Sequence, residues 1–185
     1  MAEFSHEFAA AWAAMTTRFL KVECWQEYRE IEAAPSQEAY RRGDIALAQE
    51  LLRAEAEADR PLYADISRSG IEFARIRLVK PPLTPYLRYE MMAYRIRAAM
   101  GETIEVVELP ATAALPSADY FDFLVFDAAV ALVHDYGTGS TGHQSGGWLV
   151  RDRRAVASLA DKALRLRAGA RPLGESLGRE GQDRR

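Results

Sequence analysis

Residues 71–109 follow one another as a strand, a tight turn, an amphipathic helix and a second strand. Residues 71–79 are rich in β-branched and apolar side chains, and Pro81-Pro82 ends this strand because proline cannot donate to a sheet ladder. Thr84, followed by a proline, offers a side-chain cap for the helix. A helix of this length between two strands implies a parallel pair with a right-handed crossover. The stretch therefore predicts a βαβ unit.

Patterns on either side of this unit predict further elements. Residues 18–25 alternate apolar and charged side chains, as a half-buried strand does, and we place this strand near an edge of the sheet. Residues 44–60 have the apolar period of a helix, and Pro61 is expected to end or kink it. Residues 121–126 and 129–136 are two short apolar strands, close enough in sequence to form a hairpin.

These elements predict a single α/β domain over residues 1–169. We expect a mixed sheet of about five strands, with the βαβ unit at its centre, the hairpin extending it and helices on both faces. The domain comprises an N-terminal strand and helical layer (1–70), the central sheet (71–136) and a terminal helix (152–169). Residues 170–185 are polar and are expected to form a disordered tail.

Composition narrows the class of protein. A chain of 185 residues buries about 70% of the surface that its unfolded form exposes. The net charge of −3 argues against direct contact with nucleic acid. The single cysteine, Cys24, excludes an internal disulfide and is typical of a reducing compartment. Residues 8–15 lack the basic flank and long apolar core of a signal peptide or membrane anchor. We therefore expect a cytoplasmic protein without membrane contact.

A glycine-rich segment and three nearby polar residues are candidates for a phosphate-binding loop and a metal site. Residues 137–143, GTGSTGH, match the G-x-G-x-x-G pattern, but further loop residues intervene before the next helix, so we interpret the segment as a surface connection. His134 and Asp135 point to opposite faces of a strand and do not form a metal site with His143. No nucleophile motif occurs, so we expect no catalytic residue. We also expect no metal and no cofactor.

A polar and aromatic stripe runs along the helix of the βαβ unit. Its residues, spaced by four, four and three, are Tyr86, Glu90, Tyr94 and Arg97. The stripe lines a pocket, with tyrosines stacking on a flat ligand and Arg97 meeting an anion, or it forms the boundary between buried and wet surface. Both interpretations stay open, and the second is the simpler one.

Arginines also lie inside the first strand of the unit. Arg77 alternates with apolar residues, and in a sheet covered on both faces it needs a carboxylate, which Glu90 or Asp127 is placed to provide. The complete polar cluster that we consider as ligand-binding or structural consists of Arg77, Tyr86, Arg88, Glu90, Tyr94, Arg97 and Asp127.

Several short motifs recur in a fixed order along the chain: RLV at 77–79, PLTPYLRYE at 82–90, GETI at 101–104 and FDFLVFD at 121–127. In this order and spacing they resemble an uncharacterised actinobacterial domain family, over about residues 19–173. Members of that family are often encoded beside helix-turn-helix regulators, so the resemblance implies a regulatory setting and no assigned activity. The chain departs from the family pattern at Arg97, where asparagine is expected, and in its glycine-rich loop.

The succession of an arginine-bearing strand, a helix, a second strand and the hairpin LVFDAAVALV also resembles half of a phospholipase D-like domain. Such domains occur in non-catalytic form as sensor modules of bacterial transcription regulators. The catalytic form needs His-x-Lys followed by Asp, and none of His6, His134 and His143 has a lysine two residues later. The resemblance therefore implies a fold without the enzyme activity.

Together these observations favour a cytoplasmic regulatory or ligand-sensing protein that acts through a protein partner, with a helix-turn-helix transcription regulator as the partner considered. Two alternatives stay open. One is a phosphate- or nucleotide-handling enzyme that uses Arg77, Arg88 and Glu90, with the glycine-rich loop as a lid. The other is the toxin of a two-gene conflict system.

Overall fold

The computed structural model describes residues 2–28, 34–137 and 144–176. Its sheet has seven strands in the order β6-β5-β4-β1-β2-β3-β7. The strands are β1 (Arg18–Glu23), β2 (Glu72–Val79), β3 (Ile104–Glu108), β4 (Phe123–Phe126), β5 (Val130–Asp135), β6 (Gly146–Val150) and β7 (Arg171–Pro172). The mixed α/β class is confirmed, whereas the predicted number of about five strands is wrong.

The βαβ unit forms as its sequence predicts. β2 and β3 pair in parallel, and α4 (Pro85–Ala99) connects them. The hydroxyl of Thr84 accepts a hydrogen bond from the backbone N–H of Leu87 at 3.1 Å, which caps the first turn of α4. Beyond the C-terminal end of this helix, Gly101 has a φ of 111°, a conformation that strains residues with a Cβ atom. Local sequence signals are thus sufficient for this unit.

The first strand lies inside the sheet. The sequence analysis had placed it near an edge, and that prediction is wrong. β1 pairs in parallel with β2 and antiparallel with β4. Its alternating charges, Lys21 and Glu23, resembled the wet face of an edge strand. Instead they face the helix layer above the sheet, where ion pairs compensate them. A period of two cannot distinguish solvent from a polar interior.

The two strands that the sequence analysis missed lie at the edges of the sheet. β6 pairs with β5 and begins with two glycines, which weaken any strand pattern. β7 has two residues and pairs with β3. It belongs to the stretch 170–185 that was expected to be a disordered tail. Here Leu173 packs in a cluster with Val79 and Ile104, so residues 171–176 are ordered. Part of the glycine-rich loop, 138–143, and the end of the tail lie outside the described residues.

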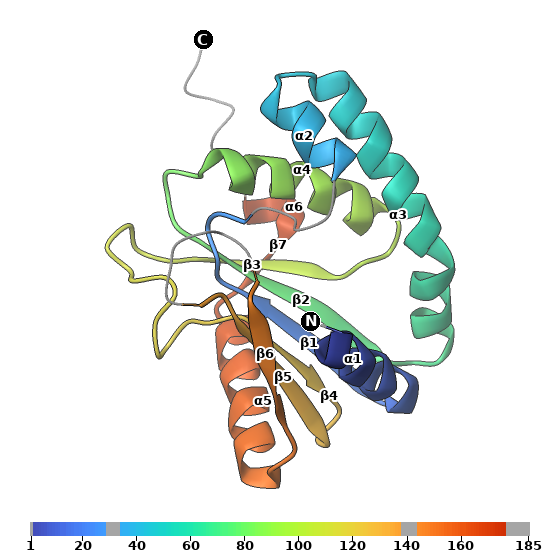
Figure 1. Ribbon diagram of the computed structural model, residues 1–185, viewed down its shortest axis with the longest axis vertical. Helices are drawn as coiled ribbons and strands as arrows, with labels where there is room; N and C mark the ends of the chain where they lie inside the picture. The colour runs from blue at the N-terminus through green and yellow to red at the C-terminus, as the bar shows by residue number, and fades with distance from the viewer. Residues whose placement is uncertain (1, 29–33, 138–143, 177–185) are drawn as a thin grey trace.

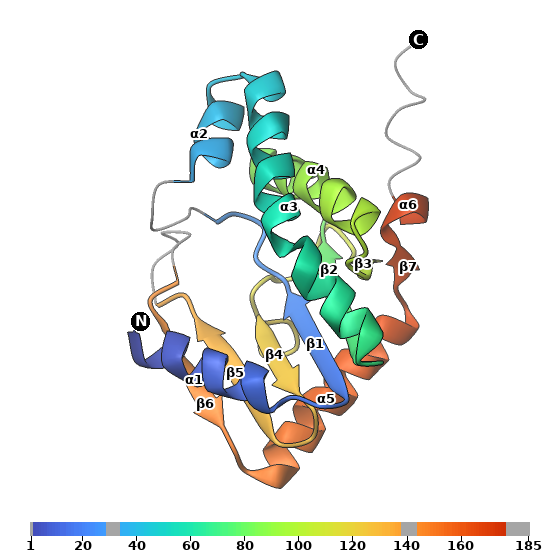
Figure 2. The same cartoon turned by 90° about the vertical axis from the view of Figure 1, so that its right-hand side faces the viewer.

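Helices cover both faces of the sheet (Figures 1 and 2). Besides α4, the structure has α1 (Ala2–Ala14), α2 (Pro35–Arg41), α3 (Ile45–Arg68), α5 (Arg153–Ala168) and α6 (Leu173–Ser176). α3 continues through Pro61, where an end or kink had been expected. Tyr63 and Ile66, both buried after the proline, hold the last turns against the body of the protein and offset the lost hydrogen bond. None of the described helices has both the length and the apolar character of a membrane span.

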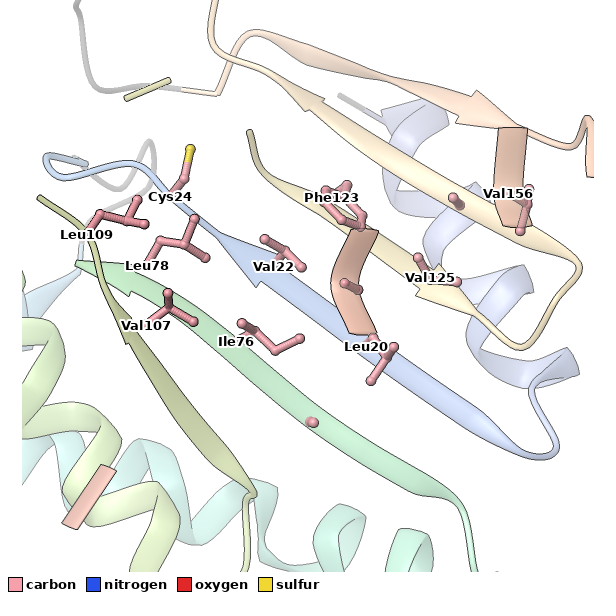
Figure 3. Close-up of a cluster of buried hydrophobic side chains, with 13 residues drawn as sticks. Leu20, Val22, Cys24, Ile76, Leu78, Val107, Leu109, Phe123, Val125 and Val156 are labelled. Carbon is pink, nitrogen blue, oxygen red and sulfur yellow. The ribbon is translucent and has the colours of Figure 1, made fainter. Parts of the chain in front are cut away.

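The two faces of the sheet differ in chemistry. On the α5 side, Leu20, Val22, Ile76 and Leu78 form an apolar core with Val156 of α5 (Figure 3). On the other side, an aromatic cluster packs beneath α1, where the rings of Trp12 and Phe19 are 5.2 Å apart. Further along this second face the side chains are charged and lie beneath α3 and α4. The polar cavity of the protein is found there.

Asp127 fixes the start of β1, whereas Arg77 lies on β2 beside Glu23, the last residue of β1. Asp127 occupies the β4–β5 turn with a φ of 50°. Its carboxylate accepts hydrogen bonds from the hydroxyl and backbone N–H of Thr16 and of Thr17, and from the backbone N–H of Arg18, at 2.7–3.1 Å. Burial raises the pKa of Asp127, but the hydroxyl of Thr17 and these backbone groups outweigh it, so the pKa lies well below its ordinary value.

We predict that Asp127→Ala lowers the free energy of unfolding by about 1–3 kcal/mol, because several donors lose a charged acceptor. Asp127→Asn is expected to cost less, since an amide oxygen still accepts. The depressed pKa means that the stabilisation is present above pH ~4 and is lost as the pH falls below the ordinary Asp value. Urea denaturation between pH 3 and pH 7 measures both effects. Asp119→Ala, on an exposed loop, serves as control, and an equal loss in that variant would contradict the assignment.

Candidate functional site

A cavity of about 360 Å³ lies between the charged face of the sheet and α4. β1 and β2 form its floor, α4 and part of α3 cover it, and residues near β4 and β5 form its rim. The register of the parallel pair places Lys21 beside Arg75 and Glu23 beside Arg77. Because alternate residues of a strand share a face, all four charged side chains point into this layer. Strand pairing therefore collects charges that are more than fifty residues apart in sequence.

Glu23 and Arg75 form the buried centre of this layer. Arg75 donates from Nη1 to Glu23 at 2.9 Å and from Nε to Glu102 at 2.6 Å. The Glu102 side chain is fully buried. Lys21 Nζ lies 2.7 Å from Glu23. Burial raises the pKa of Glu23, but the charges of Arg75, Lys21 and Arg77 prevail and hold that pKa well below its ordinary value. Arg75 is therefore a structural cation, compensated on two sides.

The polar network continues from Glu102 to the surface of α3. The Tyr63 hydroxyl donates to Glu102 at 2.8 Å, and Arg97 Nη1 contacts that hydroxyl at 3.1 Å and Asp59 at 2.5 Å. Burial and the charge of Glu102 raise the pKa of Tyr63 to about 12. Arg97, expected to meet an anion, thus does so within the chain itself, and it binds α4 to α3.

Arg77 differs from the other arginines of the site. The residue is 2% exposed and lines the cavity, and one of its Nη atoms donates to the backbone oxygen of Trp25. Its Nε has no hydrogen-bond partner among the described residues. Within the described part of the chain no carboxylate lies within 4 Å of its guanidinium. Neither Glu90 nor Asp127, the two partners expected from the sequence, pairs with it.

The charge of Arg77 is nevertheless retained. Burial lowers its pKa, while Tyr94, Tyr86 and Glu23 raise it, and the net result lies above the ordinary value for arginine. The guanidinium lies over the ring of Tyr86, 5.9 Å from its centroid. Arg77 is therefore a buried cation that is held by the field of the pocket and by one carbonyl, not by an ion pair.

Glu90 faces the same cavity by way of Tyr94. The hydroxyl of Tyr94 lies 2.5 Å from Glu90 and 2.8 Å from Glu23, so its single proton is shared between two carboxylates. Burial, followed by the charges of Glu23 and Glu90, raises the pKa of Tyr94 well above its ordinary value. This hydroxyl is consequently a donor at neutral pH and not a base.

Aromatic rings form the rim next to Arg77. The ring centroids of Trp25 and Tyr136 are 4.2 Å apart, and those of Tyr28 and Tyr86 are 6.2 Å apart. Asp122 holds this rim together, because it accepts hydrogen bonds from the backbone N–H of Cys24 at 2.6 Å and from the Tyr136 hydroxyl at 2.7 Å. The rim is thus an aromatic wall that Asp122 holds in place, with the guanidinium of Arg77 next to it.

The structure brings together most of the residues that the sequence singled out. Those that line the cavity are Arg77, Tyr86, Glu90, Tyr94 and Arg97. Arg88 is exposed on α4 and absent from the lining, and Asp127 lies at the other end of β1. Sequence reasoning missed several lining residues, notably Lys21, Glu23, Trp25, Asp122 and Tyr136. The charged alternation in residues 18–25 was the available signal, but only strand pairing shows that it faces α4.

Other reactive groups were located in the described residues. Cys24 lies in the core on the α5 side, where burial and the charge of Asp122 raise its pKa well above the ordinary value. His134 lines the cavity, and burial together with Lys21 lowers its pKa, so the imidazole is neutral at pH 7. No group of three or more metal-binding side chains occurs in the described part of the chain. What the geometry offers is a polar cavity of small-molecule size, in which Arg77 lacks a carboxylate partner among the described residues.

The fold and the cavity define a mixed α/β domain with a polar pocket of small-molecule size. The chain belongs to the family described as Domain of unknown function (DUF6879), whose model matches residues 6–177. No curated protein matches the chain. Among solved structures it is weakly similar to a phospholipase D family member, Nuc, from Salmonella typhimurium. The identity is 10%, the match covers 92% of this chain and 91% of that chain, and the TM-score is 0.45.

The two arginines of β2 are expected to respond differently to substitution. Arg75→Met leaves Glu23 and Glu102 buried with less compensation, so we predict a loss of about 3–5 kcal/mol in the free energy of unfolding. Arg77→Met removes a charge that no carboxylate of the described residues contacts, so we predict a loss of about 1 kcal/mol or less. Urea denaturation at pH 7 compares the two variants. Equal losses would show that Arg77 is as structural as Arg75.

Proposed function

We propose that this protein is a cytoplasmic regulatory protein that senses a small molecule in the cavity beneath α4 and acts through a protein partner. The observation that carries the proposal is Arg77, a cation that is 2% exposed, lines the cavity and lacks a carboxylate partner among the described residues. Burying a guanidinium without a directly bonded counter-charge is costly, even where the field of more distant carboxylates keeps it charged. An anionic ligand would provide the direct counter-charge that Arg77 lacks among the described residues.

The polar network offers a route from the ligand to the surface. Tyr94 and Glu23 line the cavity, and Glu23 is joined through Arg75 and Glu102 to Tyr63 of α3. From there Arg97 reaches Asp59 on the partly exposed side of α3. Because these contacts are hydrogen-bonded and largely buried, we expect a shift at one end to change the geometry at the other. Such coupling supports a sensor that alters a surface on which a partner acts.

The resemblance to a family encoded beside helix-turn-helix regulators supports a transcription regulator as the partner. A net charge of −3 suits the partner of a DNA-binding protein better than a DNA-binding protein itself. The competing phosphate-handling enzyme would use Arg77, Arg88 and Glu90, yet Arg88 lies outside the cavity lining. If the protein were instead the toxin of a two-gene conflict system, its expression would arrest growth, and coexpression of the neighbouring gene would relieve the arrest.

We predict that the low-molecular-mass fraction of the native cytoplasm raises the melting temperature of the protein. A ligand at about 100 times its Kd adds about 2.7 kcal/mol, which corresponds to a rise of roughly 5–10 °C for a domain of this size. Arg77→Met should abolish the rise, whereas Arg88→Met, on the exposed side of α4, should retain it. Differential scanning fluorimetry measures all three proteins. No rise in the wild type, or an equal rise in Arg77→Met, would contradict the proposal.

The partner is tested by affinity purification of the tagged protein from its native cytoplasm, followed by size exclusion and mass spectrometry. We expect a helix-turn-helix regulator in a stable ratio, and we expect its retention to change when the small-molecule fraction is removed by dialysis. In Arg77→Met the retention should no longer respond to dialysis. Recovery of the tagged protein alone would overturn the partner half of the proposal and leave the ligand half to the thermal experiment.

A further inference from the structure

We propose that the ligand of the cavity is a small planar monocarboxylate, bound by the guanidinium of Arg77 and stacked against the aromatic rim. This inference rests on the proposed function, since it names the chemical class that the same pocket accepts. It is drawn from three properties of the site: the pairing of its charges, the donors that Arg77 has left, and the rings that surround them.

The total charge of the lining is balanced, so it is the local pairing at Arg77 that favours a ligand with a single negative charge. The cations of the lining are Lys21, Arg75, Arg77 and Arg97, and its carboxylates are Glu23, Glu55, Glu90 and Asp122. Lys21 and Arg75 pair with Glu23 at 2.7 and 2.9 Å, and Arg97 pairs with Asp59 at 2.5 Å. Arg77 is thus the lining cation left without a carboxylate among the described residues. A monoanion compensates it, whereas a phosphate dianion would place a second charge near Glu23 and Glu90.

The free donor of Arg77 suits a carboxylate. A guanidinium presents its N–H groups in a planar fork that matches the two oxygens of a carboxylate. One Nη of Arg77 is held by the Trp25 carbonyl, which fixes the plane of the fork, and Nε keeps an N–H without a partner in the described residues. A neutral amide of the same shape would leave the charge uncompensated, and sites built around such a group reject ligands that fail to satisfy it.

The rings beside Arg77 favour a flat ligand body. Tyr86 lies beneath the guanidinium at 5.9 Å, and the centroid of Tyr28 is 6.2 Å from Tyr86 and 6.1 Å from Tyr136. All three residues line the cavity, and each is partly exposed. A planar molecule stacks on such rings without losing rotatable bonds. The volume of about 360 Å³ is near the lower end for small-molecule pockets, so it suits a body of one or two fused rings.

Isothermal titration calorimetry with matched probes tests the class. Each aromatic monocarboxylate, such as benzoate or 2-naphthoate, is compared with its amide, with the aryl phosphate, and with a saturated carboxylate such as cyclohexanecarboxylate. We expect the planar carboxylates to bind the wild-type protein at least about tenfold more tightly than any of these analogues. Arg77→Met should remove the preference for carboxylate over amide, and Tyr86→Leu should remove the preference for planar over saturated bodies. Arg88→Met should change neither.

The outcomes separate this inference from the proposed function. If no planar carboxylate is preferred, while the cytoplasmic small-molecule fraction still stabilises the wild type but not Arg77→Met, the ligand class is overturned and the sensing role stands. If aryl phosphates bind more tightly than carboxylates, the monoanion argument is overturned. If neither the probes nor the cytoplasmic fraction acts on the protein, both the class and the sensing role are overturned.

Discussion

The parallel pairing of β1 with β2 is the constraint on which the rest of the structure depends. It brings Glu23, Arg75 and Arg77 onto one face of the sheet, where they are covered by a helix and largely removed from water. Charges in such a place must be compensated, and Glu102, just before β3, completes the buried pair for Arg75. The βαβ unit therefore also compensates its own charge. Glu102, which precedes β3, pairs with Arg75 of β2.

The two arginines of β2 show how position alone changes the surroundings of a buried charge. Both point to the same face and both are buried, yet Arg75 contacts two carboxylates whereas Arg77 contacts a backbone carbonyl. The first arginine joins β1, β2 and the start of β3. The second leaves a charge at the wall of a cavity, beside Tyr86 and the aromatic rim. An ion-paired arginine and an arginine without an ion pair among the described residues thus lie two positions apart on one strand.

The sheet has one apolar face and one largely charged face, and the apolar face offsets the cost of burying charges on the other. On the α5 side a continuous apolar cluster, including Ile76, Leu78 and Phe123, supplies the hydrophobic stabilisation. On the opposite side the aromatic cluster beneath α1 seals one end, and polar contacts between α3 and α4 close the other. Because the apolar face carries most of the burial, the charged face is able to retain a hollow.

The sequence by itself determined the elements whose signals are local: the cap at Thr84, the βαβ unit, the hairpin at Asp127 and the grouping of Tyr86, Glu90 and Tyr94 on α4. Only the tertiary structure decided that β1 is central and that β6 and β7 extend the sheet. It also decided that Arg97 pairs with Asp59, while Arg77 meets no carboxylate in the part of the chain that is described. The physical reason is range. Caps and periodic faces are encoded within a few residues, whereas strand register and charge compensation depend on pairings across the whole chain.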